Sequence, residues 1–113
     1  MSEILGRGTT VSGGEVEGVL RTANEIAEVL ALLKLDDLDQ TIIVTDSPSA
    51  TAVVPLLPRI KGVICRSGGL TSHLVIVCRE FELPCLVAAE LPLGADIEGR
   101  RARILADGAI ELA

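Results

Sequence analysis

Residues 67–80 read SGGLTSHLVIVCRE and contain His73, the only histidine of the chain. Two glycines and two hydroxyl residues come directly before this histidine, and an apolar run follows it. On propensity alone, Leu74–Val77 would form a strand. A strand is already expected at residues 61–65, however. The chain that follows it is too short to turn around before a second strand at Leu74–Val77. We therefore expect a helix over residues 71–82.

This arrangement predicts a phosphate-binding site beside a nucleophile. Gly68 and Gly69 allow backbone N–H groups to approach an anion closely, and a helix start adds N–H donors and partial positive charge. Thr71 and Ser72 add hydroxyl donors, and we expect them to cap the helix as well. Neutral imidazole attacks phosphorus well, has an ordinary pKa of about 6.5, and forms a labile phosphorus–nitrogen bond. His73 is the predicted nucleophile, and the other four residues are called the phosphate seat below.

Outside this stretch, the pattern predicts short strands that alternate with helices. The β-branched run Thr41–Thr45 is apolar on both faces at its centre, which is typical of a strand covered on two sides. Asp107-Gly108 between two apolar runs is a strong hairpin signal. The expected strands are 15–20, 41–45, 61–65, 85–88, 102–105 and 109–112, and the other expected helices are 24–33 and 50–57.

The composition limits the function classes. The chain has 113 residues, enough for one domain, and its 16 acidic against 10 basic residues give a net charge of −6. An acidic chain is a poor binder of the nucleic-acid backbone, and a single aromatic residue, Phe81, offers no stacking platform for bases. We therefore expect no nucleic-acid partner.

The cysteines predict an apolar core rather than a reactive or metal-binding centre. Cys65, Cys78 and Cys85 lie among apolar neighbours without the spacing of a zinc knuckle, so we expect no metal site. None of them lies where a thiol pKa would be lowered, which disfavours a Cys-His enzyme. The longest apolar runs, such as Leu74–Cys78, are far shorter than the roughly 20 residues that cross a bilayer. No secretory signal is visible at the start, so we expect a cytoplasmic protein without membrane contact.

Residues 68–80, together with Leu83-Pro84-Cys85-Leu86-Val87, resemble the signature of the phosphohistidine swivelling domain, the mobile domain of PEP-utilising enzymes. That domain occurs in phosphoenolpyruvate synthase, pyruvate phosphate dikinase, rifampicin phosphotransferases and the first enzyme of the phosphotransfer system. Residues 12–18 are similar to the family's early glycine turn, and residues 42–48 to its central strand and turn. The resemblance implies a single compact α/β domain over residues 1–113, with a swivelling β/β/α fold.

The resemblance also implies a function and partners. His73 would be phosphorylated on a ring nitrogen within a seat formed by Gly68, Gly69, Thr71 and Ser72. The chain would be a phosphotransferase component, catalytically incomplete alone, that shuttles the phosphoryl group from an ATP-grasp-type nucleotide-binding partner to a pyruvate/PEP-type or other acceptor site. Mg and ATP or phosphoenolpyruvate would be bound by these partners and not by this chain.

One alternative stays open. A swivelling module that keeps the motif, docks on a partner enzyme and regulates it without turnover would have the same sequence features.

Overall fold

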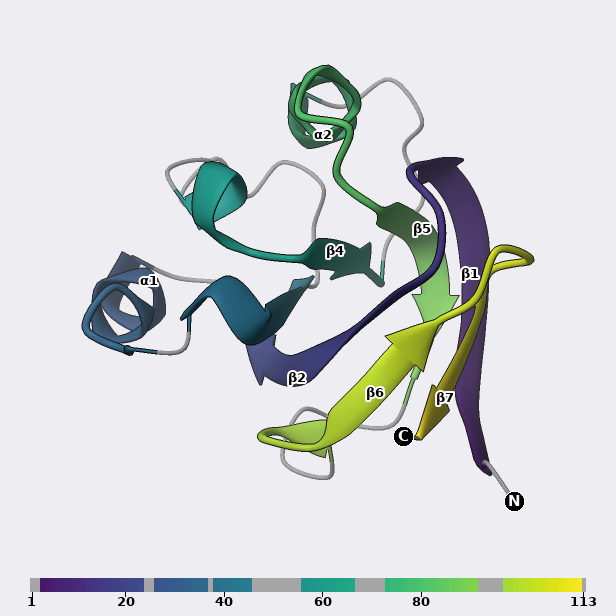
Figure 1. Ribbon diagram of the computed structural model, residues 1–113, viewed down its shortest axis with the longest axis horizontal. Coiled ribbons are helices and arrows are strands. Elements are labelled where there is room, and N and C mark those ends of the chain that lie inside the picture. Colours follow the sequence, from purple (N-terminus) through teal and green to yellow (C-terminus); the bar gives the residue numbers. More distant parts are fainter. Residues whose placement is uncertain are drawn as a thin grey trace.

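The strands of the chain form a closed barrel in the order β1-β5-β4-β3-β2-β6-β7 (Figure 1). The computed structural model describes residues 3–23, 26–36, 38–45, 56–66, 73–91 and 97–112. The strands are β1 (Glu3–Ser12), β2 (Val16–Thr22), β3 (Thr41–Thr45), β4 (Gly62–Cys65), β5 (Cys85–Glu90), β6 (Arg101–Ile104) and β7 (Ala109–Leu112). The helices within the described part are α1 (Ile26–Leu32), the 3-10 helix η1 (Leu38–Gln40) and α2 (His73–Glu80).

The barrel combines a parallel half and an antiparallel half. Strands β2, β3, β4 and β5 run parallel to one another, whereas β1, β6 and β7 pair antiparallel with their neighbours. The pairs Thr22↔Val44 and Thr45↔Cys65 show that β2, β3 and β4 end at the same level. The ends of these three strands form one edge of the barrel, which we call the carboxyl edge, and β5 continues past this level to Glu90.

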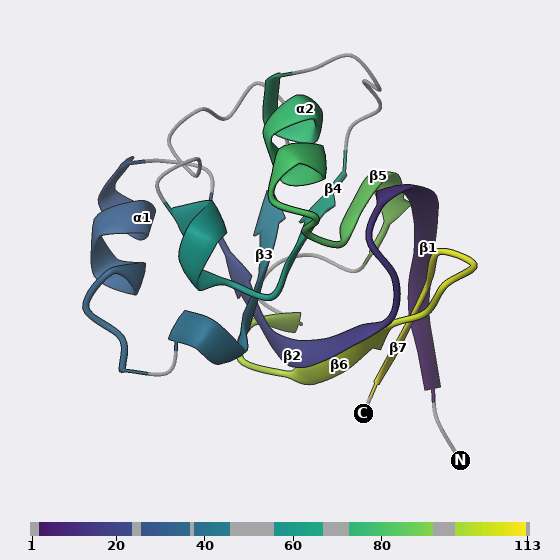
Figure 2. The same cartoon turned by 45° about the horizontal axis from the view of Figure 1, so that its top comes forward.

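Two apolar layers stabilise the barrel. Side chains alternate along β3, so that Ile42 and Val44 belong to one buried cluster and Ile43 to another. The first cluster draws on six strands, which places it in the barrel interior; it includes Leu20, Ile42, Val44, Ile64, Leu86, Ala102, Ile104 and Ile110. The second cluster lies outside the parallel strands, where α1, α2 and a 3-10 turn at residues 56–59 cover it (Figure 2).

Most of the elements expected from the sequence are confirmed. The structure contains the strands expected at 41–45 and 85–88 and the hairpin around Asp107-Gly108. The helices expected at 24–33 and 71–82 correspond to α1 and α2. Of the helix expected at 50–57, residues 50–55 lie outside the described part, and residues 56–59 form a 3-10 turn. The long strand β1 had not been expected at all.

The architecture is richer in β-structure than the expected α/β description. Strand β1 pairs with β5 on one side and with β7 on the other, and this double pairing closes the sheet. The helices pack on the outside of this barrel (Figures 1 and 2). The chain is therefore a compact β-rich domain. Among the described residues, no helix combines the length and hydropathy that crossing a bilayer needs.

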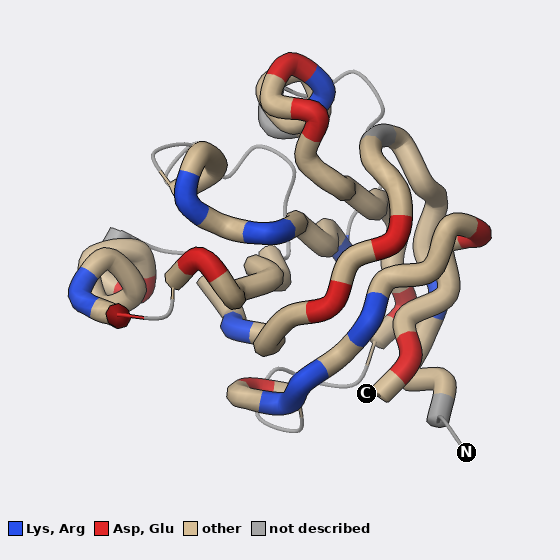
Figure 3. Tube along the Cα trace, viewed as in Figure 1, with Lys and Arg blue, Asp and Glu red and all other residues tan. Residues whose placement is uncertain are grey.

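Residues of opposite charge lie on the neighbouring strands β2, β6 and β7 (Figure 3). Arg103 of β6 pairs with Glu17 of β2 at 2.9 Å and with Glu111 of β7 at 3.1 Å. The hydrogen bond from Arg103 lowers the pKa of the Glu17 carboxyl below its usual value. Glu17 is thus a cross-strand ion-pair partner of Arg103.

Gly18 of β2 provides a test of how closely the strands pack. A Cβ at this position would lie 2.6 Å from the backbone oxygen of Gln40 and 3.1 Å from Cγ1 of Ile42. We expect Gly18→Ala to lower the free energy of unfolding by about 1–3 kcal/mol, because a backbone oxygen cannot move aside without disturbing β3. Urea unfolding measures the change.

Gly14→Ala is the matched control, since no atom lies within 4 Å of a Cβ there. It should change the free energy of unfolding by less than about 0.5 kcal/mol. Equal stability of the two variants would contradict the close approach of β2 to Gln40.

Candidate functional site

Helix α2 begins with His73 at the carboxyl edge of the barrel. Val75, in the first turn of this helix, is completely buried against Cys65, the last residue of β4, and Val87 of β5. This contact holds the first turn of α2 beside the end of β4 and the neighbouring part of β5 (Figure 2). The backbone of His73 is thereby placed beside the barrel edge.

The start of α2 has the electrostatic properties of an anion site. The first N–H groups of any helix have no acceptor within the helix, and the aligned peptide dipoles add partial positive charge there. Gly68, Gly69, Thr71 and Ser72 lie within residues 67–72, outside the described part of the chain, as does the side chain of His73. The structure therefore places His73 at the first position of α2, and the phosphate seat remains a prediction.

Arg66 adds positive charge to the same edge. Its amide N–H donates to the carbonyl oxygen of Thr45 at 2.9 Å, and its Nη1 donates to the carbonyl oxygen of Leu91 at 2.8 Å. The half-buried side chain thus links the end of β4 to the residue that follows β5. In the sequence Arg66 stands two residues before Gly68, where an arginine could steer an anion but is more commonly an ordinary surface residue.

The opposite end of α2 has a well-defined cap. The N–H of Leu83 donates to the oxygen of Cys78 at 2.9 Å, and the N–H of Glu82 donates to the oxygen of Arg79 at 3.1 Å. These two bonds form a Schellman motif, in which the residue after the helix adopts a left-handed conformation. Glu82 has this conformation, with φ of 54°. The helix therefore stops before Pro84, as expected.

Arg79 and Glu80 are exposed in the last turn of α2, at the opposite end of the helix from His73. Nε of Arg79 donates to the carbonyl oxygen of Val11 at 3.1 Å, which ties α2 to β1. Arg79 therefore has a structural role.

The three cysteines are buried core residues, as predicted. The Cys78 thiol of α2 and the Cys85 thiol of β5 are hydrogen-bonded to each other. That hydrogen bond, together with burial, raises the pKa of Cys85 far above its usual value. Cys85 is therefore a neutral thiol at physiological pH and not a nucleophile. The described residues contain no cluster of three His, Cys, Asp or Glu side chains suited to a metal ion.

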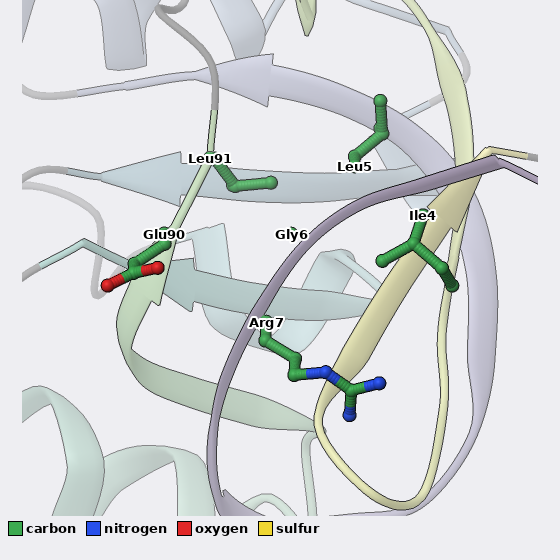
Figure 4. Close-up of a pocket in the computed structure, with 6 residues that line it drawn as sticks. All are labelled: Ile4, Leu5, Gly6, Arg7, Glu90 and Leu91. Carbon is green, nitrogen blue, oxygen red and sulfur yellow. The ribbon is translucent and has the colours of Figure 1, made fainter.

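A cavity of about 440 Å³ lies between β1 and the end of β5 (Figure 4). Of the described residues, Ile4, Leu5, Gly6 and Arg7 line one side of it and Glu90 and Leu91 the other. Arg7 is paired with Asp107 at 3.4 Å. No described residue of α2 lines this cavity, so we assign it no part in the chemistry of His73.

The sequence and the structure are both similar to known proteins. The family model "PEP-utilising enzyme, mobile domain" matches residues 38–109. A probable phosphoenolpyruvate synthase of Methanothermobacter thermautotrophicus is 35% identical over 85 residues, which are 75% of this chain and 12% of that protein. A rifampicin phosphotransferase of Bacillus subtilis is 34% identical over 99 residues, which are 86% of this chain and 10% of that protein. The chain thus spans about a tenth of the length of these relatives.

Among solved structures, the N-terminal domain of Enzyme 1 - Nitrogen superposes with a TM-score of 0.54 and 26% identity, over 74% of this chain and 37% of that chain. Aconitase X of Thermococcus kodakaraensis superposes with a TM-score of 0.64, over 96% of this chain and 97% of that chain. Its sequence is only 16% identical, so this second likeness concerns the fold alone.

The cap of α2 yields a prediction about the stability of the helix that begins with His73. A left-handed conformation is unfavourable for a residue with a Cβ and natural for glycine. We expect Glu82→Gly to raise the free energy of unfolding by up to about 1 kcal/mol. Thermal unfolding measures this change.

Glu80→Gly, two residues earlier and inside the helix, should instead lower the free energy of unfolding by about 1 kcal/mol. Destabilisation by both glycine variants would show that residue 82 does not have the left-handed conformation.

Proposed function

Since the chain belongs to the family of PEP-utilising enzyme mobile domains, we propose that it is a histidine phosphoryl carrier of a phosphotransferase, with His73 as the residue that is phosphorylated. The observation that carries the proposal is that the only histidine of the chain is the first residue of a helix that is held over the barrel edge. Any phosphohistidine in this chain would therefore be at position 73.

The proposed step is a phosphoryl transfer in two directions. The lone pair of a neutral ring nitrogen of His73 forms the phosphorus–nitrogen bond as the bond between phosphorus and the donor's oxygen breaks, and that oxygen keeps the electron pair. Transfer to an acceptor reverses the step, with an acceptor oxygen as the attacking group. The protein contributes mainly positioning and charge stabilisation to this step, because phosphoryl transfer needs little further covalent chemistry.

The phosphate seat would supply that stabilisation. The N–H groups at the start of α2, the backbone of Gly68 and Gly69, and the hydroxyls of Thr71 and Ser72 are donors of the kind that bind phosphoryl oxygens. Arg66 at the carboxyl edge adds a guanidinium charge near the site.

The remaining components would lie on partners. We propose that residues 1–113 form one mobile domain that swivels between an ATP-grasp-type nucleotide-binding unit and a pyruvate/PEP-type or other acceptor unit. Mg and ATP or phosphoenolpyruvate would be bound there. Strands β1 and β2 precede the matched residues 38–109 but pair with β5, β7, β3 and β6, which supports their inclusion in the same domain. Three free thiols suit a reducing, cytoplasmic setting.

The seat is tested without any partner by phosphoramidate, a small phosphoryl donor that needs no enzyme. We expect the folded chain to gain one acid-labile, alkali-stable phosphoryl group on His73, at least about ten-fold faster than the chain unfolded in urea, because the helix start stabilises the transferred group. Phosphorus NMR follows the reaction, and His73→Asn is the control that should gain none. Equal rates for the folded and unfolded chains would contradict the proposed seat.

The carrier role is tested with labelled phosphoenolpyruvate and labelled ATP in fractionated extract of the source organism. We expect label on the wild-type chain and none on His73→Asn. A stable complex with a partner enzyme, in which neither donor labels the chain, would overturn the carrier role in favour of a regulatory module.

A further inference from the structure

Helix α2 is apolar on more than the side that faces the barrel. Residues Leu74–Cys78 are apolar without interruption, whereas a helix on the surface of a domain normally has one apolar and one polar side. Val75 and Cys78 pack on the barrel and are completely buried. Ile76 lies on the outer side of the helix and is 48% exposed. Apolar residues on both sides are typical of a helix that is covered from both sides.

Phe81 extends the apolar outer surface of α2. Its N–H donates to the carbonyl oxygen of Val77 at 3.1 Å, so Phe81 follows one helical turn after Val77. Val77 is only partly buried, and Phe81, the single aromatic residue of the chain, is 50% exposed. The chain thus leaves its one aromatic ring at the surface, although aromatic rings stabilise a fold most when they are buried. We call Ile76, Val77 and Phe81 the outer patch.

The outer patch differs from the other exposed apolar residues in the described part of the chain. Ile4 of β1 and Leu30 of α1 are also about half exposed, but each is the single such residue described on its element. Scattered residues of this kind are normal on protein surfaces, whereas neighbouring exposed apolar residues mark sites of interaction. Phenylalanine is also among the residues enriched in protein interfaces. The outer patch is therefore the surface of this domain best suited to a protein partner.

The outer patch begins one turn after His73. Residues three, four and seven positions apart lie on one side of a helix, and Ile76, Val77 and Glu80 have this spacing from position 73. A protein bound on the outer patch would therefore lie next to the start of α2. A phosphoryl donor must bring its reacting atom to within about 3 Å of the nucleophile. The protein that holds this donor must then contact the same side of the helix.

We propose that the outer patch is the docking surface for the protein unit that donates the phosphoryl group. This inference rests on the proposed carrier function and adds to it the surface and the chemistry of the partner. The donor unit covers Ile76, Val77 and Phe81 with an apolar surface of its own. The exposed Glu80 lies at the polar rim of this contact.

Ile76→Gln tests the outer patch with a neutral side chain that helices tolerate well. The probe is the extract fraction that labels the wild-type chain from labelled phosphoenolpyruvate or labelled ATP. We expect the variant to need at least about ten-fold more of this fraction for half-maximal labelling, because the interface loses a buried apolar side chain. Labelling of the same variant by phosphoramidate involves no partner and should proceed at the wild-type rate.

Leu30→Gln is the matched control, since it makes the same kind of change at a half-exposed position of α1. It should need no more of the fraction than the wild type does. Wild-type labelling of Ile76→Gln, or an equal loss in Leu30→Gln, would overturn the docking surface and leave the carrier function intact. If no fraction labels the wild-type chain from either donor, the carrier function itself fails, and the donor unit is overturned as the occupant with it.

Two further measurements distinguish other occupants of the outer patch. In sedimentation, a wild-type dimer that Ile76→Gln dissociates would identify a second copy of this chain as the occupant. In a chase of the labelled chain, wild-type gain but slower loss of label in Ile76→Gln would identify the acceptor unit. Either result would overturn the donor unit as the occupant, and we expect neither.

Discussion

The burial of Val75 against Cys65 and Val87 is the contact on which the position of His73 depends. A helix of eight residues is too short to be stable by itself in water, so tertiary packing must hold it in place. The contact at Val75 holds its first turn, the hydrogen bond from Arg79 to Val11 ties its last turn to β1, and Glu82 and Leu83 close it with a Schellman motif. Both ends of α2 are thus fixed to the barrel, and the direction of its dipole is fixed with them.

The barrel explains why distant segments meet at one edge. Strands β2, β3 and β4 end together there, so the start of α2 and the Arg66 guanidinium both lie along the carboxyl edge. Strand β1 closes the barrel, because it pairs with β5 on one side and with β7 on the other. The antiparallel half of the barrel carries the ion pairs of Arg103 instead.

Local sequence patterns were sufficient to predict the elements with strong signals. The β-branched run of β3, the Asp107-Gly108 hairpin and the helix at His73 all appear where the residues indicate them. The closure of the barrel was not predictable in this way, because the pairing of β1 joins residues that are some 70 to 110 positions apart in the sequence and has no local signature. The expected single compact α/β domain was implied by the family resemblance and agreed with the alternation of short strands and helices, which does not reveal that a sheet closes on itself. The contact of Val75 with β4 and β5 was also not predictable, because an apolar residue in an apolar run does not reveal which strands it contacts.

The central claim is that the fold presents the phosphoryl group of His73 to the N–H groups at the start of α2. Amide NMR of the chain before and after phosphorylation of His73 tests this most directly. The account predicts large downfield shifts of the amide protons in the first turn of α2, as they donate hydrogen bonds to phosphate, and little change in the antiparallel half of the barrel. A phosphorylated, folded chain whose first-turn amide signals do not move would contradict it.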